Sequence, residues 1–318
     1  MKERYNNVYS ELPTVLAGKY AEVLSVYTDD DGNKAVVPQG WPVSGMAKEN
    51  IIWGVNKGLV IYHIPEEKVS GINWQNPDEI ETLMRTYDQF VWTPVGLLTA
   101  NGTLDGIHFN EKFGRMNYQN DDFSETEFQE PLVGELLFQK KSVDKYGGYY
   151  SSRYNISKDE KTEKIRSVKG ANPYKNIYFE TAKEVISTML KSETVTSHLM
   201  YGAEYDTRIK WVIEVGTVTT NDCIEDSTKL GNYWNNKNYP SRILETGEDG
   251  CINNIYGFAG NLREFTQEQC KSGSSRVIRG GSYDCTGYER SITYREYYDL
   301  FNDQSHLFAG FRATIDIK

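Results

Sequence analysis

The sequence predicts an α+β protein with little regular secondary structure. Two stretches carry apolar residues at helical spacing, one over Tyr178–Lys191 and the other over Glu204–Val215. The segment that follows, Thr217–Asp249, has no apolar period and is rich in Asn, Asp, Thr and Gly, which predicts a long loop. Short strand-like runs at Arg276–Ile278 and Ala313–Ile317 close the chain.

The N-terminal region, residues 1–135, is expected to be β-rich and to play a role in attachment or packing that stays open. After a short helical or irregular lead-in come strand-like runs separated by turns rich in Gly, Pro and Asp. These runs span Glu22–Tyr27, Ala35–Val37, Lys57–Tyr62 and Phe90–Val95. An acidic interval, Tyr118–Glu130, indicates an exposed loop or linker, and we place a domain boundary near residue 135, with the second domain at residues 136–318.

Charge and hydropathy exclude two classes of partner. The net charge is −10 and Lys and Arg do not cluster, which argues against nucleic acid. No apolar stretch approaches the length of a membrane span, so we expect no membrane insertion. The opening residues, MKERYNN, contain no apolar segment, so we expect no Sec signal peptide and synthesis in the cytoplasm.

Tyrosine is the unusual residue, with 23 copies against 12 phenylalanines. A tyrosine combines a large rigid face with a hydroxyl, which suits contact surfaces, although half-buried tyrosines in strands account for at least half of them. The four cysteines, Cys223, Cys251, Cys270 and Cys285, form no CxxC pair, and no histidine stands at ligand spacing. We therefore expect no zinc site and four free thiols, with one disulfide involving Cys270 or Cys285 as the alternative.

Three strings near the C-terminus carry most of the information about the fold. They read NIYGFAGNLREFT at residues 254–266, VIRGGSY at residues 277–283 and AGFRA at residues 309–313. Their glycines mark places where the backbone bends tightly or packs closely. Arg279 and Arg312 stand among apolar residues, so we expect them to be buried and paired with carboxylates or carbonyls, with Glu264 as the partner of one.

In order and spacing these strings resemble the signatures of the formylglycine-generating-enzyme, or sulfatase-modifying-factor, family, whose domain is a variant of the C-type lectin fold. The resemblance covers residues 145–318. It implies a C-type lectin domain in which the residues of the strings hold the fold. These structural residues are Asn261, Glu264, Arg279, Gly280, Gly281 and Arg312.

The resemblance also implies that the chain is not an enzyme. The oxidases of the family use two cysteines soon after the second string to bind copper and the substrate thiol. Cys285 falls on the first of these positions, but the second is Arg290. A guanidinium is neither a soft metal ligand nor able to exchange disulfides, so we expect no catalytic residue. The four histidines are scattered and do not suggest the iron site of the sulfoxide-synthase relatives.

The family also binds a cation near the first string, through backbone carbonyls, a Glu and an Asp or Asn. Glu264 matches the Glu, whereas Gly257 occupies the position of the Asp or Asn. A calcium ion prefers about six to eight oxygen ligands, so the loss of a carboxylate weakens such a site. We therefore expect no metal and no cofactor, with a calcium ion near Glu264 as the less favoured alternative.

Between the last two strings lies a segment, residues 283–308, that we call the display segment. It mixes aromatic side chains with adaptable polar ones and has five acids against two arginines, a composition typical of a paratope. An ordinary solvent-facing loop is the alternative interpretation, and retained apolar residues such as Ile292 indicate that not every position varies. The candidate ligand-binding residues are Tyr283, Asp284, Tyr288, Glu289, Tyr294, Glu296, Tyr297, Tyr298, Asp299, Asn302, Asp303 and His306.

The position of the display segment is similar to that of the mutagenised region in variable proteins of diversity-generating retroelements, which include phage receptor-binding proteins of the major tropism determinant type. This resemblance implies a prophage- or retroelement-associated protein that binds a protein or a cell-surface receptor. It implies a place on the virion tail or the cell exterior if the protein is prophage-derived, and leaves the oligomeric state open between monomer and trimer. The alternatives are a structural virion or surface component and, less favoured, an oxidase of the sulfatase-modifying type.

Overall fold

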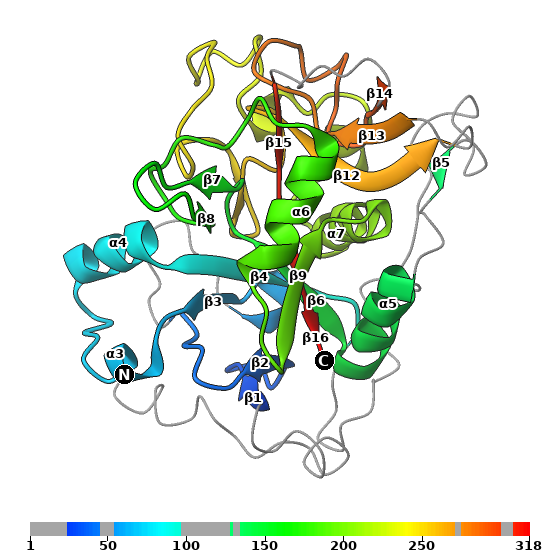
Figure 1. Ribbon diagram of the computed structural model, residues 1–318. Coiled ribbons are helices and arrows are strands. Elements are labelled where there is room, and N and C mark those ends of the chain that lie inside the picture. The colour runs from blue at the N-terminus through cyan, green and yellow to red at the C-terminus, as the bar shows by residue number, and fades with distance from the viewer. Residues whose placement is uncertain (1–23, 45–53, 97–127, 130–133, 271–274, 300–307) are drawn as a thin grey trace.

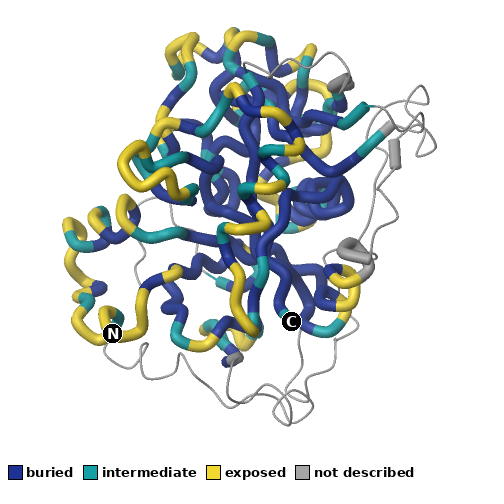
Figure 2. The backbone as a smooth tube through the Cα atoms, in the orientation of Figure 1, coloured by how far each residue is buried: buried dark blue, intermediate teal, exposed yellow. Residues whose placement is uncertain are grey.

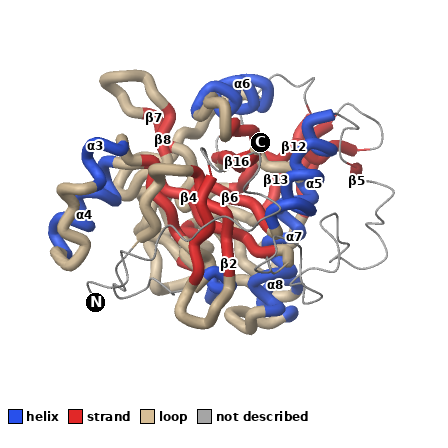
Figure 3. Tube along the Cα trace, turned by 90° about the horizontal axis from the view of Figure 1, so that it is seen from below, coloured by secondary structure: helices blue, strands red, loops and turns tan. Residues whose placement is uncertain are grey.

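The computed structural model describes residues 24–44, 54–96, 128–129, 134–270, 275–299 and 308–318 (Figure 1). It contains two five-stranded sheets, three small hairpins and several helices. Figure 3 shows the strands in the middle of the molecule, with helices α3 and α4 on one side and helices α5 and α7 on the other. The mixed α and β content predicted from the sequence is confirmed.

The first sheet has the strand order β3-β4-β6-β16-β9, and every pair in it is antiparallel. It combines strands from the beginning, the middle and the end of the chain. Its strands are β3 (Val60–His63), β4 (Asp88–Pro94), β6 (Gly148–Ser152), β9 (Val195–Leu199) and β16 (Ala313–Ile317).

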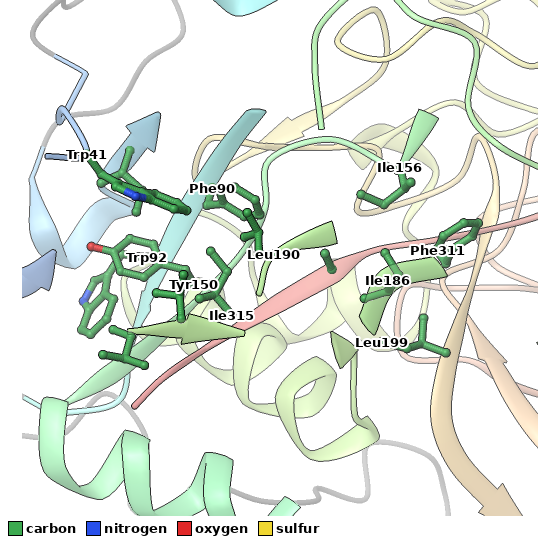
Figure 4. Close-up of a cluster of buried hydrophobic side chains, with 14 of the residues drawn as sticks. Trp41, Phe90, Trp92, Tyr150, Ile156, Ile186, Leu190, Leu199, Phe311 and Ile315 are labelled. Carbon is green, nitrogen blue, oxygen red and sulfur yellow. The ribbon is translucent and has the colours of Figure 1, made fainter. Parts of the chain in front are cut away.

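One hydrophobic core spans the position where we expected a domain boundary. Trp92 of β4 lies opposite Tyr150 of β6, and their ring centroids are 4.9 Å apart. Figure 4 shows these two rings with Trp41 and Phe90 beside Ile315, which belongs to the last strand. The expected division into residues 1–135 and 136–318 therefore does not separate two cores, because strands on both sides of it pair and bury the same apolar surface.

The second sheet has the order β14-β13-β12-β15, with β5 also paired to β12. Strands β12 and β15 run parallel, and the other pairs run antiparallel. Strand β15 continues into β16 of the first sheet through the single residue Arg312, so the end of the chain joins the two sheets (Figure 1). Its strands are β5 (Phe128–Gln129), β12 (Arg263–Cys270), β13 (Ser275–Arg279), β14 (Arg295–Asp299) and β15 (Ala309–Phe311).

Three two-stranded hairpins and four short helical turns fill the connections. The hairpins are β1 (Leu24–Thr28) with β2 (Lys34–Pro38), β7 (Ser157–Lys158) with β8 (Ile165–Arg166), and β10 (Cys251–Ile252) with β11 (Ile255–Tyr256). The short turns are η1 (Val55–Lys57), α3 (Glu66–Val69), α8 (Thr220–Ile224) and η2 (Thr228–Leu230). The last two lie within the polar stretch predicted to be loop.

The two helices predicted from apolar spacing are confirmed as α6 (Phe179–Met189) and α7 (Gly202–Glu214). Helices α4 (Pro77–Thr86) and α5 (Gly134–Tyr146) were not predicted. Helix α4 has a clear start, since Asn76 Oδ1 accepts a hydrogen bond from Asp78 N and Pro77 opens the first turn. None of the described helices is long and apolar enough to cross a membrane.

Helix α7 is buried on nearly all of its faces, although its sequence predicts a polar side (Figure 2). Three of its charged residues each meet partners from other elements. Glu204 contacts His198 of β9, Asp206 contacts two arginines of the second sheet, and Arg208 contacts Glu264 of β12. These three charged residues are therefore interior connections and do not face solvent, whereas Lys210 and Glu214 near the end of the helix pair with each other at the surface.

His198 joins α7 to the first sheet. Its Nε2 lies 2.9 Å from Glu204 Oε1, and its Nδ1 lies 3.0 Å from Asp316 Oδ2 on the adjacent strand β16. Burial by itself would lower the pKa of His198, but the carboxylates of Asp316 and Glu204 outweigh it and raise that pKa well above its ordinary value. The histidine is therefore held in its charged form.

This arrangement predicts a pH dependence of stability. Because the pKa of His198 is raised on folding, its contribution is fully present below a pH of about 6.5 and is lost as the pH rises through the folded-state pKa. Between a pH of about 6 and about 9, the free energy of unfolding of the wild type should fall relative to that of His198→Gln, as measured by urea titration.

The matched control is His63→Gln. His63 is exposed in part, but its ring stacks on Trp41, and the desolvation that results lowers its pKa. The wild type should therefore gain stability relative to this variant as the pH rises. A constant difference between wild type and His198→Gln across that range would contradict the assignment.

Candidate ligand-binding surface

A closed ring of four buried charged side chains brackets the described part of the display segment. Arg279 ends β13, before the segment begins, and Arg295 opens β14. Arg279 contacts Asp206 Oδ1 at 2.8 Å and Glu268 Oε2 at 3.0 Å. Arg295 contacts the remaining oxygens of the same two carboxylates, at 2.7 Å and 2.8 Å. The ring thus links α7, β12, β13 and β14.

The ring corrects one assumption about the display segment. From the sequence, Arg295 was counted among the charges of the displayed surface, but its side chain is 2% exposed and points inward. For Arg279, burial alone would lower the pKa, yet Asp206 and Glu268 outweigh it and raise the pKa of the guanidinium. The guanidinium of Arg279 therefore remains charged in the interior, where it depends on its two carboxylate partners.

We expect Asp206→Ala to destabilise the protein by about 3–5 kcal/mol, because it leaves two buried guanidiniums to share the single carboxylate of Glu268. Urea unfolding measures this change. The control is Lys229→Met, which breaks an ion pair with Asp222 in which the lysine side chain is 67% exposed, and which should cost less than about 1 kcal/mol. Equal losses of unfolding free energy in the two variants would show that the buried ring stabilises the protein no more than an exposed ion pair does.

After Arg279 the chain turns sharply through Gly280 and Gly281, whose φ angles are +88° and +66°. A Cβ atom on Gly281 would collide with the backbone carbonyl oxygen of Arg290, which lies on the returning part of the segment. The hydroxyl of Tyr233 donates to the carbonyl of Gly280 at 2.9 Å. The turn therefore sets where the display segment leaves the sheet and how closely its two ends approach.

Gly281→Ala should lower stability by more than about 1–2 kcal/mol, since the left-handed conformation alone costs about that much and the collision with Arg290 adds to it. Thermal unfolding reads out the loss. Gly216→Ala is the matched control, because Gly216 also has a positive φ of +74° but has nothing within 4 Å of its added Cβ. Similar losses at the two positions would argue that the contact with Arg290 is unimportant.

Beyond the turn, the display segment exposes several of the predicted ligand-binding residues. Tyr288 is 59% exposed, and Asp284 and Glu289 are also exposed. Tyr283, Tyr294 and Glu296 are half-buried. Five of these six residues thus lie on one loop that leaves the second sheet at β13 and returns to it at β14, and Glu296 is the second residue of β14.

The half-buried side chains of the segment are held by neighbours. The ring of Tyr283 meets the edge of Phe308 at 5.6 Å, and the guanidinium of Arg290 lies 4.4 Å from the centroid of Tyr294. Glu296 Oε2 forms ion pairs with Arg290 Nη1 and with Arg263 Nε, both at 3.2 Å. Aromatic groups fixed in this way lose little conformational entropy when they bind a partner.

The other six predicted residues are placed only in part. Tyr297, Tyr298 and Asp299 belong to β14, where they pair with Val277, Arg276 and Ser275 of β13. The composition of the segment had suggested a loop throughout. The structure shows instead that its second half begins with strand β14. The side chains of these three residues and all of Asn302, Asp303 and His306 lie outside the described residues.

A second loop, residues 227–236, supports the display segment and was missed from the sequence. Ser227 N donates to Gly287 O at 3.0 Å, Trp234 N donates to Cys285 O at 3.0 Å, and Gly287 N donates to Asn235 Oδ1 at 3.3 Å. Trp234 is 55% exposed. The polar stretch that contains this supporting loop has no apolar period. The single tryptophan in that stretch, Trp234, was the one sequence feature that could have indicated a contact residue there.

The remaining structural residues tie the second sheet to the rest of the molecule. Arg312 Nε donates to Glu264 Oε1, and its Nη1 donates to the carbonyl of Ser152 at 3.1 Å. Asn261 has a φ of +58°, and its Oδ1 accepts from Leu244 N at 2.8 Å. These contacts explain why the first and third strings hold the fold at fixed places.

The oxygens of Glu264, near which calcium was the less favoured expectation, are occupied by protein donors. Arg312 and Asn155 donate to Oε1, and Arg208 donates to Oε2 at 3.3 Å. The space beside Gly257 is filled by Asp249, whose pKa burial raises to about 7. Among the described residues, no group of three or more His, Cys, Asp or Glu side chains is arranged to hold a metal.

The described thiols are unpaired and unactivated. Cys223, Cys251 and Cys285 are free, and the side chain of Cys270 lies outside the described residues. Burial raises the pKa of the Cys285 thiol, which donates to the carbonyl of Ser282 at 3.1 Å. The thiolate that metal binding or nucleophilic attack requires is therefore disfavoured at this position.

Comparison with known proteins adds little to this geometry. No family model matches the chain, and no curated protein matches it. The structure is similar to Treponema denticola variable protein 1, with a TM-score of 0.30 and 14% identity over 72% of this chain and 84% of that one. A likeness of this size decides neither the fold nor the function.

Proposed function

We propose that the chain is a target-binding protein of the variable-protein type, built on a C-type lectin fold, that presents the display segment to a protein or cell-surface receptor. The observation that carries this proposal is the contrast between the two sides of the segment. The buried ring of Arg279 and Arg295 holds the strands on either side of residues 280–294, whereas Asp284, Tyr288 and Glu289 are exposed on the loop between them. A rigid frame with exposed aromatic and polar side chains is what a paratope requires.

We propose further that the chain has no oxidase activity. Cys285 is the first of the two cysteines expected for that chemistry, but Arg290 stands at the second position and is engaged with Glu296 and Tyr294. We also propose that Glu264 holds Arg312 and does not bind a calcium ion, since its oxygens already accept hydrogen bonds from three side chains. A location on a virion tail or cell exterior, and a monomeric or trimeric state, belong to the same proposal.

The experiment is selection of ligands from a phage-displayed library of random peptides on the immobilised full chain. Peptides that recur should bind at the display segment, because binding surfaces with fixed aromatic groups dominate such selections. We expect the double substitution Tyr288→Ala with Glu289→Gln to weaken a recurrent peptide by about tenfold or more, which corresponds to about 1.4 kcal/mol. Isothermal titration calorimetry measures the affinities.

The control is Phe138→Ala on helix α5, an exposed aromatic side chain on a different part of the molecule, which should change the affinity by less than about twofold. Both variants should stay close to the melting temperature of the wild type, since the substituted side chains are at the surface. Peptides that bind both variants as they bind the wild type would count against the display segment as the binding surface.

A further inference from the structure

The surface beside the display segment contains an aromatic residue from a different part of the chain. Among the described residues, the large hydrophobic side chains that stay exposed are Phe138, Tyr178, Trp234 and Tyr288. Trp234 and Tyr288 belong to loops that are hydrogen-bonded to each other through the contacts between the supporting loop and residues 285–287. The fold therefore places two exposed aromatic side chains on adjoining loops.

The supporting loop is held in place on its inner side as well. Asn236 Nδ2 donates to the carbonyls of Thr228 and Gly231, at 2.8 Å and 2.9 Å. A Cβ atom on Gly287 would collide with the backbone of Thr228, so the two loops are in close backbone contact. Lys237 Nζ lies 5.1 Å from the centroid of the Trp234 ring. Trp234 is thus a positioned side chain on an ordered loop, a condition for a strong contact residue.

The charge that this loop presents to solvent differs from the sum of the charges in its sequence. Residues 283–296 contain three acids, Asp284, Glu289 and Glu296, and two arginines, Arg290 and Arg295. Because Arg295 points into the buried ring, the outward charge of residues 283–296 taken alone becomes −2 in place of −1. Arg263 of β12 offsets part of this charge at Glu296, from which its Nε lies 3.2 Å away. The guanidinium of Arg290 is already engaged with Glu296.

The two other acids remain oriented outward. Among the described residues, the cation that pairs with Asp284 is Arg263, whose Nη2 lies 3.9 Å away, and Ser282 Oγ donates to Asp284 Oδ1. Glu289 Oε2 accepts from the hydroxyl of Thr286 at 2.6 Å. Both side chains are exposed on the same loop as Tyr288. Carboxylates next to exposed aromatic rings favour a group that is cationic at its tip and apolar along its length, as arginine and lysine side chains are.

From these contacts we infer that Trp234 is a fixed part of the binding surface and that the partner is a protein segment that inserts a lysine or arginine side chain between Trp234, Tyr288 and the carboxylates of Asp284 and Glu289. This inference rests on the proposed function. It adds a contact residue outside the display segment and a chemical class for the partner. The aromatic rings contact the apolar stem, and the carboxylates accept hydrogen bonds from the charged end.

The test uses recurrent peptides from the selection on the full chain. We expect them to be enriched in Lys and Arg, and to bind Trp234→Ala about tenfold more weakly than the wild type. The substitution pair Asp284→Asn with Glu289→Gln should cause a similar loss, and the affinity of the wild type should fall as salt is added. Phe138→Ala is again the control and should bind within about twofold of the wild type.

A second measurement avoids the question of whether a variant folds. The wild-type chain is exposed to hydroxyl radicals with and without the bound peptide, and oxidation of Trp234 is quantified by mass spectrometry. Bound peptide should protect Trp234 and leave Phe138 unprotected. Peptides that depend on Tyr288 and Glu289 but neither protect Trp234 nor respond to its substitution would overturn this inference and leave the proposed function standing.

Two other outcomes of the peptide selection would also contradict the inference. Recurrent peptides that are indifferent to both loops would overturn the inference together with the proposed function. Recurrent peptides without Lys or Arg, or binding to a glycan array in place of peptides, would overturn the assignment of a basic protein partner.

Discussion

The structure depends on helix α7, a helix buried on almost every face that carries three paired charges. Glu204 holds His198 of the first sheet, Asp206 closes the ring with Arg279 and Arg295, and Arg208 meets Glu264. Burying charges costs desolvation energy, and a hydrophobic replacement of the same shape is often as stable. Paired charges also restrict how the elements can be arranged, since each carboxylate oxygen of Asp206 must meet a particular guanidinium. The helix thereby fixes the position of the second sheet relative to the first.

That fixed geometry explains how an exposed surface can stand on a largely irregular scaffold. Between β13 and β14 the chain has turns but no long element, and stiffness must come from its ends. The ring holds both strands by their arginines, and the supporting loop adds backbone hydrogen bonds at Cys285 and Gly287. Substitutions at outward positions leave these contacts intact. The side chains that hold the fold and those that we propose to meet a partner are thus different side chains of the same segment.

Several of the residues and helices that hold the fold could be predicted from the sequence. Where a prediction was wrong, the cause is a contact between parts of the chain that are distant in sequence. The glycine and arginine strings and the helix α6 follow local rules of spacing and conformation. Arg295 was assigned to the surface because the residues around it are polar, and only tertiary contact with Asp206 and Glu268 reveals its direction. The boundary near residue 135 failed for a similar reason. Strand β4 looks like part of a separate β-rich region, and its pairing with β6 is a long-range contact that composition cannot report.

The inward direction of Arg295 also bears on which positions of the display segment are open to change. Ser291, Ile292 and Thr293 are buried, and the hydroxyl of Thr293 donates to the carbonyl of Cys223 at 3.1 Å. With Arg295 they form a short inner stretch that precedes and begins β14. Variation is therefore tolerated before this stretch, around Asp284, Tyr288 and Glu289, and is costly within it. A loop that varies under this constraint keeps its attachment to the sheet, because the side chains that hold it point inward.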